Sequence, residues 1–399
     1  MFLKKLLNRN PQFLKTVVQL HQSGKLPANS YILDLDTIEK NASVMAVEGK
    51  RLGLKVYPMT KQFGRNAPAM HAIARQGLDS YVAVDMACAL AIHSAGYKIG
   101  HLGHLVQIPN AEMNVAAQLK PIYWTVFNQE KARAASDSNS KFGRKQALLA
   151  RLYAPGDTFY MGHEGGFPVT DVCKVADSFD QLTNANFAGI TSFPALLFDV
   201  NKSDVYLTPN MATLEKAANE LRKSGRKDIE INAPGTTSTF VMEMLANAGA
   251  TQVEPGHGLT GTTPLHAVRD LPEQPAICYL SEISHIHNGK PFCFGGGLYI
   301  DPVFPEYDIK ALVGTDSDTA LKQSISVKIP PANAIDYYGI LSPERDQKVR
   351  VGDSVIFGFR VQAFVTRAFI VPITGISKDK PIVEGIYTSD GRKTNWPEW

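Results

Sequence analysis

The sequence has few of the features that mark secreted or membrane-bound proteins. Its 399 residues include only four cysteines, and none of them forms a Cys-x-x-Cys pair. In a chain of this length, that pattern argues against a disulfide framework and is typical of a reduced, cytoplasmic protein. No apolar run approaches the roughly 20 residues of a membrane helix, so no membrane partner is expected. Residues 1–20 also lack the uninterrupted apolar block of a secretion signal.

The chain has almost no excess of either charge. Lysine and arginine number 41 and aspartate and glutamate 38, so the net charge is +3. This balance gives no electrostatic reason to expect a nucleic acid as a partner. Apolar residues make up 44% of the chain, which is ordinary for a globular protein with a sizeable core. The length suggests two domains.

The spacing of apolar residues predicts an α/β protein whose larger part is a (βα)8 barrel of the TIM type. Short apolar segments alternate with amphipathic stretches, several of which end in glycine as helices do. Eight of these segments are expected to be strands: residues 56–61, 81–85, 101–108, 122–127, 148–154, 187–193, 229–232 and 251–254. A doubly wound open sheet is the alternative. It predicts a Gly-x-Gly-x-x-Gly turn after an early strand, and no early segment is followed by one.

The same pattern divides the chain into three parts. Residues 1–29 are expected to form an N-terminal helical extension, because their apolar residues recur at helical spacing. Residues 30–270 are predicted to form the barrel. From residue 271 the helical periodicity weakens and β-favouring segments dominate, so residues 271–399 are predicted to be a β-rich C-terminal domain.

A lysine stands where a barrel collects its chemistry. Lys61 follows the apolar residues Val56, Tyr57 and Met59 of the first predicted strand and precedes a turn at Gly64. The carboxyl ends of barrel strands form the rim that holds the active site. An amine at this rim is suited to forming a Schiff base, although most lysines are simply solvated. The neighbouring strand ends help to decide between these two interpretations.

Two further strand ends have the composition of a phosphate-binding site. The seventh strand is followed by the hydroxyl run Thr236, Thr237 and Ser238, just before a predicted helix. The eighth is followed by a loop that contains Gly256, His257, Gly258, Thr260, Gly261 and Thr262. Glycines let backbone amides approach an anion, hydroxyls add donors, and a helix N-terminus adds its dipole. A hydroxyl run before a helix is often only a cap, but two such loops at adjacent strand ends predict one phosphate site.

With these residues the chain resembles the fold-type III pyridoxal-phosphate enzymes, which include alanine racemase, ornithine racemase and the ornithine and diaminopimelate decarboxylases. The similarity in layout covers residues 30–390. Tyr57 to Lys61 resembles the strand that carries the cofactor lysine of that family, and Met161-Gly162-His163 resembles the alanine racemase segment whose histidine stacks on the pyridine ring. The resemblance implies pyridoxal 5'-phosphate held as an aldimine by Lys61, with Tyr57, Arg151 and His163 among its contacts.

Glu254 separates this chain from the alanine racemases it resembles. Those enzymes have an arginine before the Pro-Gly pair, whereas this chain has Glu254-Pro255-Gly256, similar to the Glu-Pro-Gly-Arg motif of the decarboxylases. In the decarboxylases the glutamate pairs with a protonated pyridine nitrogen, which draws electrons more strongly from the substrate carbanion. The arginine that ends the decarboxylase motif is His257 here, so substrate recognition does not carry over.

The resemblance also suggests a second acid/base group. A racemase needs one such group on each face of the α-carbon, because the proton leaves one face and returns on the other. Lys61 is expected to serve one face. Residues 294–301 resemble the region of alanine racemase whose tyrosine reaches the partner subunit's site, with one inserted residue, and this indicates Tyr299. Cys293 is the alternative, since the decarboxylases carry a functional cysteine in the same domain. Tyr338 is similar to the late tyrosine that reaches the cofactor phosphate.

The predicted function is therefore amino-acid racemisation by a pyridoxal-phosphate enzyme that forms a head-to-tail homodimer. Decarboxylation, favoured by Glu254, and a cofactor carrier without turnover are the alternatives. The substrate's side chain stays open, with Arg65, Arg151 and Arg360 as candidate partners of a carboxylate. No metal is predicted. The close histidine pairs, 101/104 and 285/287, supply two ligands each, and two ligands do not complete a site.

Overall fold

The computed structural model describes residues 1–299, 307–331 and 333–395, and these form two compact units. We call residues 43–60 and 74–256 the barrel unit, and residues 1–42, 61–73 and 257–399 the sheet unit. Within the described ranges, no helix combines the length and the apolar character needed to cross a membrane.

The barrel unit contains eight parallel strands, which confirms the predicted barrel. Their order is β2-β12-β11-β8-β6-β5-β4-β3, and a parallel bridge between Met59 and Val82 joins the last strand to the first. The strands are β2 (Lys55–Val56), β3 (Ser80–Ala83), β4 (Lys98–Leu102), β5 (Tyr123–Val126), β6 (Gln146–Tyr153), β8 (Ala185–Thr191), β11 (Glu230–Asn232) and β12 (Gln252–Val253). All eight overlap segments predicted from the sequence, but two of them end much earlier than expected. The strand predicted for 101–108 ends at Leu102, where Gly103 adopts a φ of +77°. The strand predicted for 56–61 is interrupted at Pro58, which has no N–H to donate.

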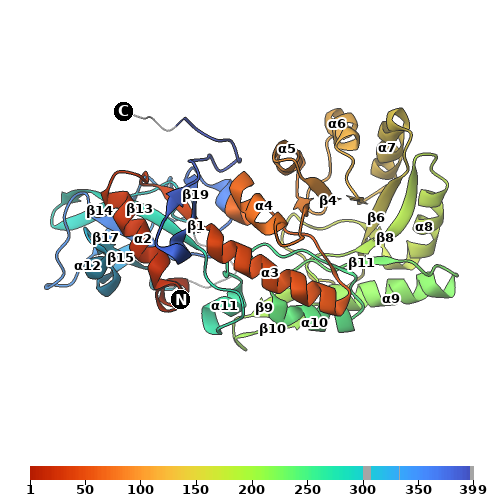
Figure 1. The fold of residues 1–399 in the computed structure, drawn as a ribbon. Coiled ribbons are helices and arrows are strands. Elements are labelled where there is room, and N and C mark those ends of the chain that lie inside the picture. The colour runs from red at the N-terminus through yellow and green to blue at the C-terminus, as the bar shows by residue number, and fades with distance from the viewer. Residues whose placement is uncertain (300–306, 332, 396–399) are drawn as a thin grey trace. The chain divides into compact units, whose positions relative to one another are not determined.

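Helices cover the outside of these strands (Figure 1). They are α5 (Met86–Ser94), α6 (Met113–Gln118), α7 (Gln129–Asn139), α8 (Val172–Asp180), α9 (Pro209–Lys223), α10 (Thr239–Asn247) and the part of α3 (Leu35–Leu52) that begins at Ser43. Helix α4 (Ala67–Ala74) belongs to the sheet unit except for its last residue. The short strand β7 (Phe167–Pro168) pairs with β6, and β9 (Leu196–Asp199) pairs with β10 (Asp204–Leu207) as a hairpin. This arrangement places the carboxyl ends of the eight strands at one end of the barrel.

The sheet unit contains a second, mainly antiparallel sheet in the order β14-β17-β16-β15-β18-β13-β1-β19-β20, in which β13 also pairs with β14. That additional pairing closes the first six strands into a small barrel. The strands are β1 (Ser30–Asp34), β13 (Ile277–His287), β14 (Lys290–Phe294), β15 (Lys310–Gly314), β16 (Ser324–Lys328), β17 (Tyr338–Ser342), β18 (Ser354–Phe357), β19 (Phe369–Thr374) and β20 (Ile382–Val383). The N-terminal strand β1 lies between β13 and β19, pairing antiparallel with the former and parallel with the latter.

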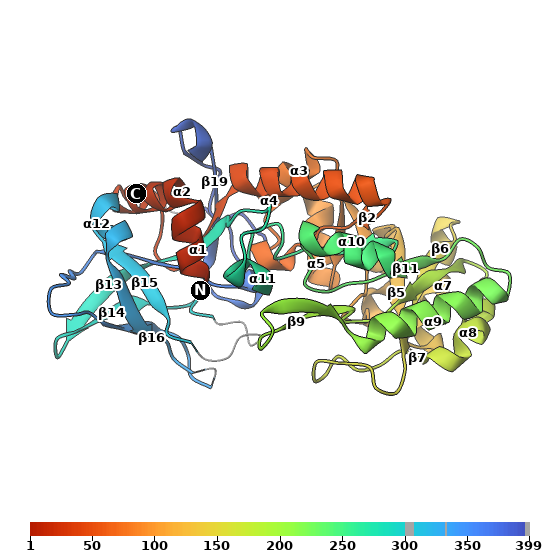
Figure 2. The same ribbon diagram turned by 90° about the horizontal axis from the view of Figure 1, so that it is seen from below.

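The apolar residues near the N-terminus form two helices, α1 (Phe2–Arg9) and α2 (Pro11–Gln22), that pack in the sheet unit. Figure 2 shows them beside α12 (Ser317–Lys322) and the antiparallel strands. Phe13, Leu14, Val17 and Val18 of α2 are fully buried in a core that includes Ile356 of β18. These helices therefore complete the hydrophobic core of the sheet unit.

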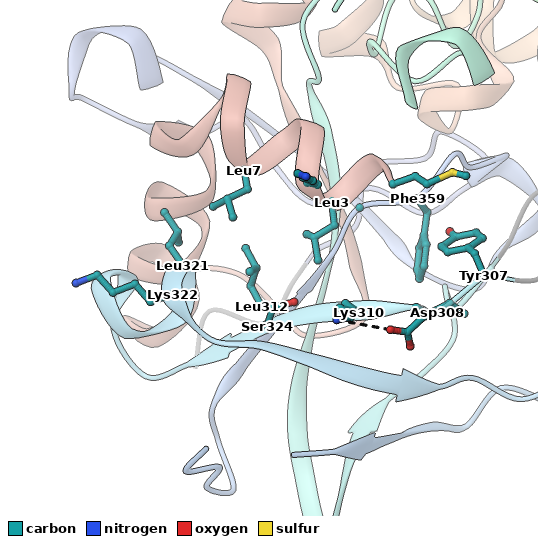
Figure 3. A pocket seen from close by; sticks show the side chains of 14 residues that line it. Leu3, Leu7, Tyr307, Asp308, Lys310, Leu312, Leu321, Lys322, Ser324 and Phe359 are labelled. Atoms are coloured by element: carbon teal, nitrogen blue, oxygen red, sulfur yellow. Dashed lines mark ion pairs between the residues drawn. The ribbon is translucent and has the colours of Figure 1, made fainter. Parts of the chain in front are cut away.

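A pocket of about 400 Å³ lies between α1 and the strand β15 (Figure 3). Leu3 and Leu7 of α1 face Leu312 of β15 and Leu321 of α12, and Lys310 pairs with Asp308 at 3.6 Å. None of the site residues predicted from the sequence lines this pocket.

Candidate active site

The carboxylate of Glu254 lies directly after β12, at the end of the barrel where strand termini meet, and it is 2% exposed. Asn232, the last residue of the neighbouring strand β11, donates a 2.8 Å hydrogen bond to its Oε1. Nδ1 of His101 on β4 contacts the same oxygen. Burial opposes ionisation, but the electrostatic attraction of the nearby His104 and His101 rings and these hydrogen bonds outweigh it and lower the pKa of Glu254 to about 2. Glu254 is therefore a buried carboxylate at neutral pH.

Two hydroxyls support the residues that bind Glu254. Thr125 of β5 lies 2.6 Å from Nε2 of His101, and Thr191 of β8 donates a 2.8 Å hydrogen bond to Oδ1 of Asn232. All four residues come from barrel strands, and His101, Asn232 and Thr125 are fully buried. The network thus links four strands around one carboxylate.

His101, His104 and Glu254 form a cluster of the residue types that bind metal ions. Nε2 of His104 lies 3.5 Å from Oε2 of Glu254, and the ligand atoms of His101, His104 and Glu254 all lie within 4.8 Å of one another. However, His101 and Glu254 already contact each other through a hydrogen bond. Two ligands at about 2.0–2.2 Å from one zinc ion would have to be farther apart than a hydrogen-bonded pair. In this geometry the two residues form a hydrogen-bonded pair, and a metal ion would require them to move apart.

Arg151 on β6 holds three loops of the barrel unit. It donates hydrogen bonds to the backbone carbonyls of His163 (2.7 Å), His104 (3.3 Å) and Phe193 (3.4 Å), and its guanidinium lies 4.7 Å from the ring centroid of Phe127. Burial lowers the pKa of Arg151 to about 10, so the side chain stays protonated at neutral pH. His163 itself lies 5.9 Å from Phe193, ring centroid to ring centroid. The structure therefore places Arg151 beside the backbone of His163, and the contact of both side chains with one ligand stays a prediction.

The hydroxyl run after β11 has the properties of an anion site. Ser238 precedes the nine-residue helix α10 but its side chain caps no backbone amide of that helix. The hydroxyls of Thr236, Thr237 and Ser238 are buried and have no hydrogen-bond partner in the part of the chain that the structure describes. Thr237 is 2% exposed and Ser238 is fully buried. Buried hydroxyls are costly unless something satisfies them, so three at a helix N-terminus fit a phosphate group.

Tyr57 packs at the first strand of the barrel unit. Its ring lies 6.3 Å from that of Tyr123, centroid to centroid. Glycine at position 100 makes room for the Tyr57 ring, since a Cβ on Gly100 would lie 2.4 Å from Cδ1 of Tyr57. Burial, with Tyr123, Glu230 and Glu254 nearby, raises the pKa of Tyr57, so the phenol stays protonated. Tyr57 is therefore a buried, protonated side chain that lies close enough to Glu254 to feel its charge.

Lys61 belongs to the sheet unit and begins the short 3-10 helix η1 (Lys61–Phe63), directly after Thr60 of the barrel unit. Its Nζ lies 6.0 Å from the ring centroid of Phe364, and the guanidinium carbon of Arg65 lies 5.2 Å from the same ring. Gly64 forms the expected turn with a φ of +64°, and a Cβ there would lie 2.6 Å from Ile370. The ring of Phe364 therefore contacts two cationic side chains. The turn between these two side chains requires glycine at position 64.

The loop after β12 differs from the hydroxyl run. Thr260 and Thr262 hydrogen-bond to each other through their hydroxyls at 2.8 Å, and both approach the carbonyl of His257. Gly261 has a φ of +63° and packs against the backbone of Gln274, while Gly256 and Gly258 precede it in the chain. This loop thus supplies its own hydrogen bonds, and its hydroxyls are less available to an anion than those of the first run.

His257 is buried and neutral. Its Nε2 donates a 3.0 Å hydrogen bond to the carbonyl of Val361. Burial, then the charges of Arg360 and Lys61, lower the pKa of His257 well below its usual value. The position that is arginine in the decarboxylase motif is therefore occupied here by an uncharged side chain.

Comparison with known proteins agrees with this geometry. The family model for the alanine racemase N-terminal domain matches residues 33–264, more than half of the chain. The chain belongs to the alanine racemase N-terminal domain family. A second model, the YhfX-like C-terminal domain, matches residues 278–383. The chain is also 36% identical over 391 residues to the uncharacterised protein YhfX of Escherichia coli K12, covering 98% of this chain and 99% of that one.

Solved structures show that the fold is that of the alanine racemase family. D-threonine aldolase from Filomicrobium marinum has a TM-score of 0.68 and 16% identity, covering 92% of this chain and 96% of its own. Alanine racemase of Clostridium difficile 630 with cycloserine has a TM-score of 0.65 and 15% identity, covering 92% and 100%. D-threo-3-hydroxyaspartate dehydratase from Delftia sp. HT23 has a TM-score of 0.62 and 15% identity, covering 90% and 97%. Members of this family use pyridoxal phosphate.

Three further residues that the sequence suggested for the active site, Tyr299, Cys293 and Tyr338, belong to the sheet unit. Tyr299 is half-buried and contributes to the raised pKa of Tyr31, and residues 300–301 of its predicted motif lie outside the described residues. Cys293 is fully buried in β14, and burial raises the pKa of its thiol to about 12. Tyr338 is 39% exposed and lies edge-on to His285, with ring centroids 5.0 Å apart.

The sequence did not reveal the part that His101, Asn232, Thr125 and Thr191 play around Glu254. The signal that could have found them is polarity inside otherwise apolar strands, because a buried polar side chain needs a partner. His101 was considered only as half of a metal-ligand pair, and Asn232 only as the end of a strand.

Proposed function

We propose that this protein is a pyridoxal-phosphate enzyme that racemises an amino acid. The observation that carries the proposal is the pairing of two features at strand ends of the barrel unit: a buried carboxylate at Glu254 and three buried hydroxyls at Thr236–Ser238. A phosphorylated pyridine has complementary groups for both features. Membership of the alanine racemase N-terminal domain family supports the same cofactor.

The lysine, the carboxylate and the three hydroxyls each have a definite part in this proposal. Lys61 would hold the cofactor covalently through its amine, and Glu254 would accept a hydrogen bond from the pyridine nitrogen. The hydroxyls of Thr236, Thr237 and Ser238 would donate to the phosphate at the N-terminus of α10. When bound, pyridoxal phosphate stabilises negative charge at the α-carbon of an amino acid.

Racemisation then requires two groups of this chain to move a proton. The amine of Lys61 would take or return the α-proton on one face, and the hydroxyl of Tyr299 would serve the opposite face. In the resemblance to alanine racemase, the tyrosine comes from a partner subunit, so we also propose a head-to-tail homodimer. A monomer in size-exclusion chromatography that still racemises its substrate would contradict that part.

The cofactor is tested by reducing the purified, reconstituted protein with borohydride and mapping the labelled peptide. We expect the label on Lys61, and none in Lys61→Ala. A protein that binds no pyridoxal phosphate would refute the proposal. The reaction is tested by incubating D and L amino acids in heavy water. Deuterium at the α-carbon of both enantiomers, without release of carbon dioxide, is the expected result, and Tyr299→Phe should abolish inversion.

Decarboxylation is the second candidate, because one observation favours it. Glu254 is ionised at neutral pH and so suits a protonated pyridine nitrogen, as in the decarboxylase motif. Carbon dioxide and an amine as products, without inversion of the remaining substrate, would favour this reaction over racemisation.

A further inference from the structure

The two oxygens of the Glu254 carboxylate have different surroundings. Oε1 accepts a 2.8 Å hydrogen bond from Nδ2 of Asn232 and a second hydrogen bond from Nδ1 of His101. Oε2 is buried and accepts no hydrogen bond from any described residue; Nε2 of His104 lies 3.5 Å from it. The carboxylate is therefore hydrogen-bonded through Oε1, whereas Oε2 has the longer ion-pair contact with His104 and no hydrogen bond from a described residue.

The contact with His101 fixes which ring nitrogen carries a proton. A carboxylate oxygen only accepts hydrogen bonds, so Nδ1 of His101 must be the donor. Nε2 lies 2.6 Å from the hydroxyl of Thr125, which can donate to it in the neutral ring. Thr125 thus stabilises the tautomer that binds Glu254.

The arrangement is hard to explain as packing alone. A buried carboxylate with one unbonded oxygen is costly, and a network that served only stability would satisfy both oxygens. His101 and Glu254 are each at most 2% exposed, so water does not easily replace the missing partner. The unsatisfied oxygen points to a donor that arrives with a ligand.

We infer that His101 is a positioning residue that, with Thr125 behind it, holds Glu254 by Oε1 and leaves Oε2 to pair with the pyridine nitrogen. The inference rests on the proposed cofactor. It assigns to His101 the task of keeping Glu254 ionised and correctly turned, so that the pyridine nitrogen of the bound cofactor carries a proton.

The test uses the full-length protein reconstituted with pyridoxal phosphate labelled with ¹⁵N in the ring, and it measures the ring-nitrogen chemical shift. We expect a protonated nitrogen in the native protein. His101→Leu removes the donor and should shift the signal toward the unprotonated form, with cofactor retention about tenfold weaker. His101→Asn, whose Nδ2 replaces Nδ1, should restore most of both properties. His93→Asn, an exposed histidine on α5, serves as the control and should change neither.

The outcomes separate this inference from the proposed function. If Glu254→Gln alters the ring nitrogen but His101→Leu does not, the cofactor proposal stands and the positioning role is wrong. If the nitrogen is unprotonated in the native protein and Glu254→Gln has no effect, the role of Glu254 itself is wrong. If no cofactor binds, both fail.

A second measurement does not depend on reconstitution or on the stability of His101→Leu. The tautomer of His101 in the cofactor-free protein is read from ¹⁵N-histidine spectra, with His101→Asn used for assignment. We expect the Nδ1-protonated form, and Thr125→Val should reduce its population. A ring protonated only at Nε2 would overturn the inference.

Discussion

Arg151 donates a 2.7 Å hydrogen bond to the backbone carbonyl of His163. Arg151 is 1% exposed, and its guanidinium also donates to the backbone carbonyls of His104 and Phe193. Arginine suits this task because its planar fork presents several donors in fixed directions. The loops that carry His104, His163 and Phe193 therefore depend on one side chain for their positions.

Replacing Arg151 by lysine should destabilise the protein although the charge is kept. A lysine has one nitrogen and does not reach three separate carbonyls, which leaves buried acceptors unsatisfied. We expect the free energy of unfolding to fall by about 3 kcal/mol in urea titrations. Arg133→Lys is the matched control, because the Arg133 side chain is 59% exposed, and it should change stability by roughly 0.5 kcal/mol or less. Equal effects of the two substitutions would contradict the loop-holding role of Arg151.

Much of the barrel was predictable because its strands are local patterns. Each of the eight segments is a short apolar run, and the period of strand and helix identifies the fold without any long-range information. Lys61 and the hydroxyl run were proposed as site residues for the same reason, since both follow such runs in the sequence.

Other features depend on contacts between distant parts of the chain. His101 and Glu254 are 153 residues apart, and nothing in the neighbourhood of either indicates the other. Strand β1 lies beside β19, with Tyr31 opposite Ile370, although both segments look like ordinary strands of their own regions. Pairings of this kind are set by tertiary packing and not by local propensity.

Thr237→Val should separate ligand binding from folding. The Thr237 hydroxyl has no protein partner among the described residues, so removing it should leave the stability of the cofactor-free protein unchanged or raise it by up to about 1 kcal/mol. The dissociation constant of pyridoxal phosphate should rise about tenfold if the hydroxyl donates to the phosphate. Thermal unfolding and fluorescence titration measure the two effects.

Thr263→Val provides the contrast. The Thr263 hydroxyl lies 2.7 Å from Nδ1 of His266 and is part of a buried hydrogen bond. This substitution should cost about 1 kcal/mol of stability in the cofactor-free protein. A comparable loss in Thr237→Val would show that Thr237 also has a structural partner.

His21 should make the sheet unit sensitive to acid. Burial lowers the pKa of His21 to about 4, whereas an unfolded histidine titrates near 6.5. Between these values the unfolded chain binds a proton that the folded chain does not, so stability falls as the pH drops from about 6.5 to about 4. The loss approaches about 3 kcal/mol, before any offset from Glu282, whose raised pKa acts in the opposite direction.

Urea titrations across this pH range measure the effect. His21→Gln removes the titrating ring, and its stability should vary less with pH than that of the native protein. His93→Asn, which changes an exposed histidine, should leave the native pH dependence intact. If the free energy of unfolding changes with pH in the same way in the native protein and in His21→Gln, His21 is not the cause of the acid sensitivity.

Cys293 should be chemically silent in the folded protein. Its thiol is fully buried in β14, its pKa is raised to about 12 by burial, and a Cβ built on Gly339 of β17 would lie only 3.1 Å from Sγ. Thiolates react far faster than thiols, so iodoacetamide at neutral pH should modify the half-buried Cys173 first and Cys293 only after unfolding. Peptide mapping of native and denatured samples gives the order of reaction. Rapid labelling of Cys293 in the native protein would mean that this strand opens to solvent, and Cys293 would then regain its place beside Tyr299 as a candidate for the second acid/base group.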